Sequence, residues 1–137
     1  MRRGEIWTVA GSAAYTGKPR PAIIIQDDRF DANDSIVVCP LTTDPTSAPI
    51  FRLPIPSNAR TGLRAPCRVM VDKVTAVPRR RLGTRVGTLS ADELKALNRA
   101  IFVFLGLSET EAPEYQADVS PTNVGGSRLD SSLRQRP

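Results

Sequence analysis

The sequence of 137 residues contains no histidine, the side chain that most often acts as a general base near neutral pH. This absence excludes Ser–His and Cys–His nucleophile arrangements. The only two cysteines, Cys39 and Cys67, lack the CxxC spacing of zinc sites, so we expect no metal and no cofactor. Both cysteines lie in apolar stretches, which predicts buried free thiols in a reducing compartment.

Other familiar signals are missing as well. The sequence has no Walker loop, no GxGxxG and no HExxH, and no apolar run approaches the ~18 residues of a membrane span. No apolar segment follows the charged residues 1–5, so there is no signal-peptide pattern and we expect a cytoplasmic protein. Four aspartates crowd residues 27–34 without the glycine and glutamate of a calcium loop, and an acidic surface turn is the expectation.

Arginine is what the sequence has in excess. There are 19 basic and 14 acidic side chains, a net charge of +5, and sixteen of the cations are arginine. Residues 1–107 carry 16 basic and 9 acidic side chains, a net +7, whereas residues 108–137 carry 3 and 5, a net −2. An arginine-rich body favours a polyanion or an acidic protein as partner. A generally basic soluble protein is the alternative.

The first hundred residues read as short strands separated by turn residues. Prolines flank the segment at 51–53, so it can only lie at a sheet edge, and Pro40 is expected to end the strand before it. The predicted strands are Glu5–Val9, 22–26, 35–39, 51–53, 68–74 and 85–87.

One helix is predicted near the end of this region. Ser90 and Glu93 have the spacing of a capping box, and a stripe of leucine, isoleucine and phenylalanine follows at three- and four-residue intervals. Gly106 stands where a left-handed residue would end the helix. Short strands plus one C-terminal helix indicate a mainly β domain over residues 1–107, a small curved sheet or barrel. The polar, aperiodic residues 108–137 are expected to form a disordered tail.

Without histidine or metal, arginine, lysine and threonine are the side chains available for chemistry. Such a set suits cleavage of RNA by its own 2′-hydroxyl, because the protein then only orients the phosphate, stabilises its developing charge and assists proton transfer. This argument establishes feasibility and leaves an enzyme and a binding module equally open.

Several segments, in order along the chain, resemble those of the MazF/PemK family of toxin endoribonucleases. Residues 3–7 (RGEIW) are similar to the family's first strand, and 18–26 (KPRPAIIIQ) to its arginine–proline segment and the strand behind it. Residues 38–43 (VCPLTT) resemble the third strand, and 68–79 a later one. Each motif is weak alone, and together they are specific over residues 2–107.

The resemblance implies an SH3-like (CcdB/PemK) barrel that forms a homodimer. It implies a type II toxin that cleaves single-stranded RNA (mRNA, tRNA or rRNA) without a metal, leaving a 2′,3′-cyclic phosphate and a 5′-hydroxyl. A cognate acidic antitoxin would be its protein partner. The family's catalytic arginine falls on Arg20, which would contact the scissile phosphate and act in proton transfer. Its catalytic threonine falls on Thr42, which would donate to a phosphoryl oxygen.

The first loop departs from the family pattern. Residues 11–18 (GSAAYTGK) lack the acid and amide that many members carry before the arginine, so those contacts do not transfer. Tyr15 is a candidate for stacking on a base and Lys18 for holding a phosphate. Further candidates for RNA binding, drawn from the same region and from the basic surface, are Thr43, Arg68, Lys73 and Arg79. A solvated charged face is the alternative for the run around Arg79.

Two other functions remain open at this point. The first is a CcdB-like gyrase inhibitor, which uses the same barrel without catalysis and depends on the end of its last helix. Here a long polar tail follows the helix, which favours the nuclease. The second is a non-catalytic SH3-like binding module. Only the resemblance to the MazF/PemK family argues against this function.

Overall fold

The computed structural model describes residues 1–11, 18–45 and 51–107. Residues Met1–Gly106 form one compact unit. Tyr15 and the predicted tail at 108–137 lie outside the described residues. The elements are β1 (Glu5–Val9), β2 (Arg20–Ile24), η1 (Asp28–Phe30), β3 (Ser35–Thr42), β4 (Arg52–Ile55), β5 (Cys67–Met70), η2 (Val71–Lys73), β6 (Thr75–Pro78), η3 (Arg79–Arg81), β7 (Leu82–Thr88) and α1 (Ala91–Phe104).

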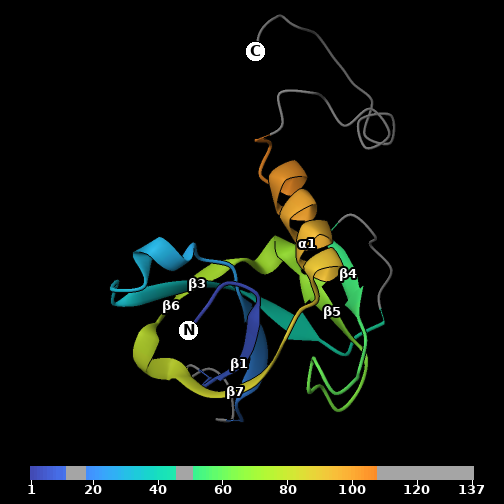
Figure 1. Ribbon diagram of the computed structural model, residues 1–137, viewed down its shortest axis with the longest axis horizontal. Helices are drawn as coiled ribbons and strands as arrows, with labels where there is room; N and C mark the ends of the chain where they lie inside the picture. The colour runs from blue at the N-terminus through green and yellow to red at the C-terminus, as the bar shows by residue number, and fades with distance from the viewer. Residues whose placement is uncertain (12–17, 46–50, 108–137) are drawn as a thin grey trace, which may run out of the picture. The chain divides into compact units, whose positions relative to one another are not determined.

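The strands form one strongly curved antiparallel sheet, shown in Figure 1, in the order β4-β5-β3-β2-β1-β7. The remaining strand, β6, pairs with β3. Helix α1 packs beside β4 and η2. The predicted class, mainly β with one C-terminal helix in a barrel-like fold, is confirmed. The flanking prolines placed residues 51–53 at an edge, and β4 is indeed the edge strand.

Strand β3 continues through Pro40, which corrects the prediction that this proline ends it. The first half of β3 pairs with β6, whereas Leu41 and Thr42 pair with β5. Pro40 lies between the part of β3 that pairs with β6 and the part that pairs with β5. Proline has no backbone N–H, and at this position no N–H is needed for a hydrogen bond to either strand. The proline therefore marks the point where β3 changes neighbours.

The single long strand predicted at 68–74 is also wrong. Strand β5 stops at Met70, η2 turns the chain, and β6 begins at Thr75. Continuous apolar character predicted one strand, but the chain must turn here to pair with two different parts of β3. Three other strands have shifted bounds: β2 covers Arg20–Ile24 instead of 22–26, β4 covers Arg52–Ile55 instead of 51–53, and β7 covers Leu82–Thr88 instead of 85–87.

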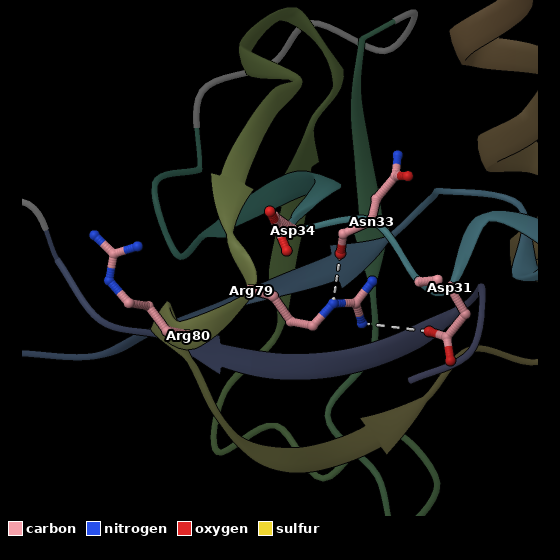
Figure 2. Close-up of a pocket in the computed structure, with 6 residues that line it drawn as sticks. Asp31, Asn33, Asp34, Arg79 and Arg80 are labelled. Carbon is pink, nitrogen blue, oxygen red and sulfur yellow. Dashed lines mark hydrogen bonds and ion pairs between the residues drawn. The ribbon is translucent and has the colours of Figure 1, made fainter.

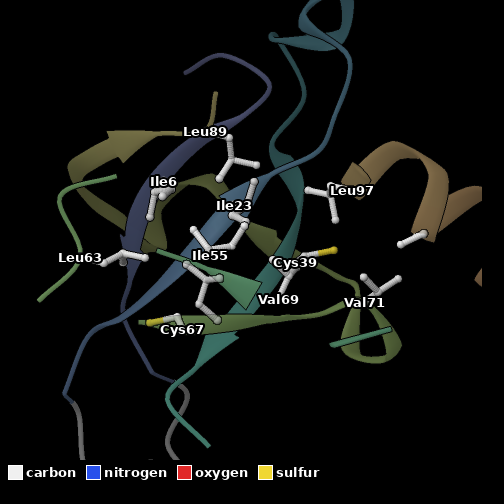
Figure 3. Packing of buried hydrophobic residues seen from close by; sticks show 12 residues of the cluster. Ile6, Ile23, Cys39, Ile55, Leu63, Cys67, Val69, Val71, Leu89 and Leu97 are labelled. Atoms are coloured by element: carbon white, nitrogen blue, oxygen red, sulfur yellow. The ribbon is translucent and has the colours of Figure 1, made fainter. Parts of the chain in front are cut away.

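Helix α1 has the ends that its sequence predicts. Ser90 Oγ accepts from the Glu93 amide at 3.1 Å, and Glu93 Oε1 accepts from the Ser90 amide at 2.8 Å. Gly106 is left-handed, with φ of 71°. The helix packs Leu97 and Ala100 against the larger hydrophobic core (Figure 3). The other buried members of that core are Ile6, Ile23, Cys39, Leu41, Ile55, Leu63, Cys67, Val69, Val71 and Leu89.

A second, smaller core lies on the opposite face of β2 and β3. Its buried residues are Ala22, Ile24, Ile36 and Val38, which alternate along these strands with residues of the larger core. Partly buried Val9, Val77 and Leu82, among others, pack around them. Both cysteines are buried and free, as predicted. Among the described residues, no helix is long and apolar enough to cross a membrane.

An ion pair holds the turn between β5 and β6 against β4. Arg52 donates from Nε and Nη2 to the two carboxylate oxygens of Asp72 at 2.9 and 3.1 Å, with side chains 15% and 25% exposed. The hydrogen bonds from Arg52 lower the pKa of Asp72. Since Asp72 lies in η2, the pair keeps that turn in place and with it the adjacent Lys73.

We expect the Asp72→Asn variant to lose stability in a pH-dependent way. A carboxylate whose pKa is lowered on folding stabilises the protein above its unfolded value, about 4, and loses that contribution as the pH falls through the folded value. The variant should therefore unfold more easily by about 1–3 kcal/mol at neutral pH. Urea unfolding across the acidic range should show this gap closing below about pH 4. A gap that stays constant with pH would contradict the ion-pair origin.

Candidate active site

A cleft of about 590 Å³ opens on the face of the smaller core, where β1, β2, β3 and β6 meet. Its floor is apolar and includes Val9, Ala22, Val38 and Val77. Its rim is polar or cationic. The described residues that line it also include Ala10, Gly11, Arg20, Pro21, Pro40, Leu41, Thr42, Met70, Lys73, Thr75, Ala76 and Arg81.

Arg20 and Thr42 line the same cleft from neighbouring strands. The ladder between β2 and β3 ends at the pair Ala22–Pro40. Arg20 and Thr42 each lie two residues beyond this last pair, on β2 and on β3. Pro21, which comes between, has no amide to donate to β3, so the strands are free to separate here. The prolines thus explain why the cleft opens where it does, with the arginine on one lip and the threonine on the other.

The two side chains differ in how they are held. Arg20 is exposed at the start of β2. Thr42 is half-buried at the end of β3, and its Oγ1 accepts a hydrogen bond from the Asp44 amide at 3.1 Å. Because that bond uses a lone pair, the hydroxyl keeps its hydrogen for donation into the cleft. An arginine fork and an oriented hydroxyl on facing strands can together hold a phosphate.

The cleft carries positive charge without neutralisation. Arg20, Lys73 and Arg81 line it, and none of its described lining residues is acidic. In the described part of the chain, no ion pair engages any of these three side chains. By contrast Arg52 and Arg79 are each paired with an aspartate. These cations without an ion pair among the described residues favour the binding of an anion.

The structure places the other predicted RNA-binding residues in different ways. Lys73 lines the cleft. Arg68 pairs with Thr42 in register, so it belongs to the same cross-strand row, although it is not among the lining residues. Lys18 and Thr43 are exposed beside the two lips. Tyr15 lies outside the described residues.

Arg79 does not line the cleft, although the basic run had suggested that it would face RNA. Its Nε donates to the Asn33 carbonyl at 2.8 Å, and its Nη1 to Asp31 at 3.3 Å (Figure 2). These contacts tie η3 to the acidic turn. Arg80 is exposed and points away from Arg79, whereas Arg81 faces the cleft.

The helical form of η3 explains this distribution. A 3₁₀ helix has three residues per turn, so three consecutive side chains point in three directions. Only one arginine of the run can therefore face the cleft. From the sequence, Arg79 was the candidate within this run, whereas Arg81 is the member that lines the cleft, because that choice depends on how η3 is anchored. The anchors are the Ala10 amide, which donates to the Arg81 carbonyl at 2.8 Å, and the Arg79 amide, which donates to the Asp34 carbonyl at 2.8 Å.

The remaining reactive groups do not form a second centre. Burial raises the pKa of the Cys39 thiol to about 12 and also raises that of Cys67, so both are unreactive at neutral pH. Among the described residues, no three His, Cys, Asp or Glu side chains are grouped so as to hold a metal ion. Asp27 caps η1, Asp28 accepts from the Arg3 amide, and Asp31 pairs with Arg79. These contacts make the acidic turn structural, as far as it is described.

Residues 2–105 match the family of PemK-like, MazF-like toxins of type II toxin–antitoxin systems. The chain belongs to this family. It is 52% identical over 108 residues to a probable endoribonuclease MazF of Mycolicibacterium smegmatis, covering 79% of this chain and 99% of the relative. It is 32% identical to the endoribonuclease MazF9 of Mycobacterium tuberculosis, covering 78% and 98%.

Solved MazF structures share the fold. The Mycobacterium tuberculosis toxin MazF-mt6 has 26% identity and a TM-score of 0.64, covering 77% of this chain and 99% of that one. A Deinococcus radiodurans MazE–MazF complex has 19% identity and a TM-score of 0.66, covering 79% and 98%, a likeness of fold alone. The resemblance drawn from the motifs is confirmed. The family and the relatives favour the MazF-type toxin endoribonuclease over a CcdB-like gyrase inhibitor.

Proposed function

We propose that this MazF-type toxin cuts single-stranded RNA at the cleft between β2 and β3, using Arg20 and Thr42. The observation that carries the proposal is their placement on opposite lips of a cationic cleft that has no acidic described residue. Arg20 binds the scissile phosphate, and Thr42 donates a hydrogen bond to a phosphoryl oxygen. Lys73 holds a neighbouring phosphate. Lys18, Thr43 and Arg68 contribute to binding from the surrounding surface.

The reaction needs no nucleophile from the protein. The 2′-oxygen of the RNA forms a bond to phosphorus and gives its proton to solvent water. The bond from phosphorus to the 5′-oxygen breaks, and that oxygen takes up a proton from water. The products are a 2′,3′-cyclic phosphate and a 5′-hydroxyl. Arg20 donates hydrogen bonds to the charge that develops on the phosphate and on the leaving oxygen, and in this way assists the transfer of a proton to that oxygen.

The positive charge of residues 1–107 also bears on the protein partners. We propose that the toxin acts in the cytoplasm as a homodimer and is neutralised by an acidic antitoxin. The net charge of +7 on residues 1–107 supports an acidic partner. A solved structure of similar fold is described as an endoribonuclease in complex with its cognate antitoxin, from a mycobacterial species.

We expect the purified protein to cut a long single-stranded RNA equally well with and without EDTA. Each product should carry a 5′-hydroxyl and a 2′,3′-cyclic phosphate, because the substrate supplies the attacking oxygen. Methylating the 2′-oxygen at a mapped cleavage site should abolish cutting there and leave other sites unchanged, which gives the control within one molecule. Loss of activity in EDTA, or cutting at the methylated position, would overturn the mechanism.

A further inference from the structure

Beside the two catalytic lips, the cleft has a part that the reaction itself does not use. Its apolar floor presents the partly buried side chains of Val9 and Val77, which lie over the buried Ala22 and Val38. Thr75 pairs with Val38 in register, so its side chain lies on that same face of the sheet. Arg81 also lines the cleft. Phosphate chemistry alone does not call for an apolar floor.

We propose that this part of the cleft is a subsite for one nucleotide next to the scissile phosphate, with its base on the apolar floor and its phosphate on Arg81. This subsite rests on the proposed RNA cleavage. It adds Arg81 as a phosphate-binding residue and the apolar floor as the contact for a base. Thr75, whose hydroxyl stands at the edge of the floor, faces the polar edge of the base.

Size and charge both favour a nucleotide. The cleft volume of about 590 Å³ lies in the range of pockets that hold small organic ligands, roughly 300–1,000 Å³. A base is flat, largely apolar on its faces and polar at its edge, which matches an aliphatic floor with a threonine at its margin. Each base comes with a phosphate, and Arg81 is a cation with no carboxylate partner among the described residues.

The anchoring of η3 explains why Arg81 can serve this role. Its carbonyl accepts from the Ala10 amide at the end of β1, which holds the residue beside the cleft. Arg79, at the other end of η3, is bound to Asp31 and Asn33. The backbone of Arg81 is therefore fixed while its guanidinium is free to bind, as a preorganised phosphate site requires.

The test is binding of a non-cleavable 2′-O-methyl RNA that spans a mapped cleavage site. Arg81→Ala should weaken binding by about tenfold or more, as loss of a hydrogen bond to a charged group does. It should also reduce the slope of log K against log salt by about 0.7, the share of one phosphate of a single strand. Arg80→Ala, the same change one residue earlier in η3, should leave both unchanged. Equal effects of the two variants would overturn the phosphate contact.

The base contact is tested by scanning the same oligonucleotide with an abasic nucleotide. In the wild type, one position beside the scissile phosphate should lose affinity by about tenfold when its base is removed. Thr75→Leu, which crowds the floor, should weaken the intact oligonucleotide and remove the penalty at that position. Thr84→Leu, an exposed threonine on β7, is the matched control and should behave as wild type. An unchanged penalty in Thr75→Leu would refute the floor as the base site.

Two outcomes separate this subsite from the proposed function. If the wild type cuts RNA and Arg20→Ala does not, but Arg81→Ala binds normally, only the subsite is wrong. If the wild type neither cuts nor binds RNA, the proposed function itself fails. Should Arg81→Ala and Thr75→Leu disturb binding of a protein partner while RNA binding stays intact, the cleft would be a protein contact and the proposal would be rejected.

Discussion

Replacing Arg20 by alanine should lower the rate of RNA cleavage by about 10²–10³-fold, the loss seen when one donor to a developing oxyanion is removed. Arg20 lines the cleft together with Thr42 and is exposed, with no ion pair among the described residues. Its removal would therefore take away the proposed phosphate contact and leave no buried partner unsatisfied. The measurement is a single-turnover cleavage rate on a defined single-stranded RNA.

The control for Arg20→Ala is an arginine that is equally exposed and lies away from the cleft. Arg99 on α1 meets this condition, and Arg99→Ala should cut at the wild-type rate. Both variants should unfold at the same urea concentration as the wild type, because neither side chain supports the core. Wild-type cleavage by Arg20→Ala would remove the catalytic assignment.

Replacing Leu97 by alanine should destabilise the domain by about 2–5 kcal/mol. Leu97 is 0% exposed and, together with Ala100, carries α1 into the larger core, where Figure 3 shows it. Its loss leaves a cavity between the helix and the sheet that rigid strands cannot fill. In a domain of this size each kcal/mol lowers the melting temperature by roughly 4–8 °C, so calorimetry should show a fall of about 10 °C or more.

The adjacent residue supplies the control for Leu97→Ala. Asn98 is on the same helix turn but exposed, and Asn98→Ala should change the free energy of unfolding by no more than about 0.5 kcal/mol. At a temperature where Leu97→Ala remains folded, its cleavage rate should equal that of the wild type, because the cleft lies on the other face of the sheet. A stability equal to that of wild type would show that the helix docks by other contacts.

Local patterns in the sequence predicted those features that depend on a few neighbouring residues. The capping box at Ser90, the left-handed Gly106 and strand β1 all appear as predicted, since a cap, a turn or a short strand is specified by adjacent side chains. Composition excluded histidine chemistry outright. The family motifs singled out Arg20 and Thr42 as candidates, and the structure has both residues lining one cleft.

Only the tertiary structure decided how β3 is shared between β5 and β6 and which arginine of η3 faces the cleft. In both cases a run of similar side chains gave no sign that the backbone turns within it. The run at 68–74 is apolar and the run at 79–81 is basic. The turn is imposed by pairing with strands and carbonyls distant in sequence, such as Ala10 with Arg81 and Asn33 with Arg79. The sequence alone therefore established that the protein has no histidine and so no histidine-based catalysis. The cleft that Arg20 and Thr42 line exists only once the strands are paired.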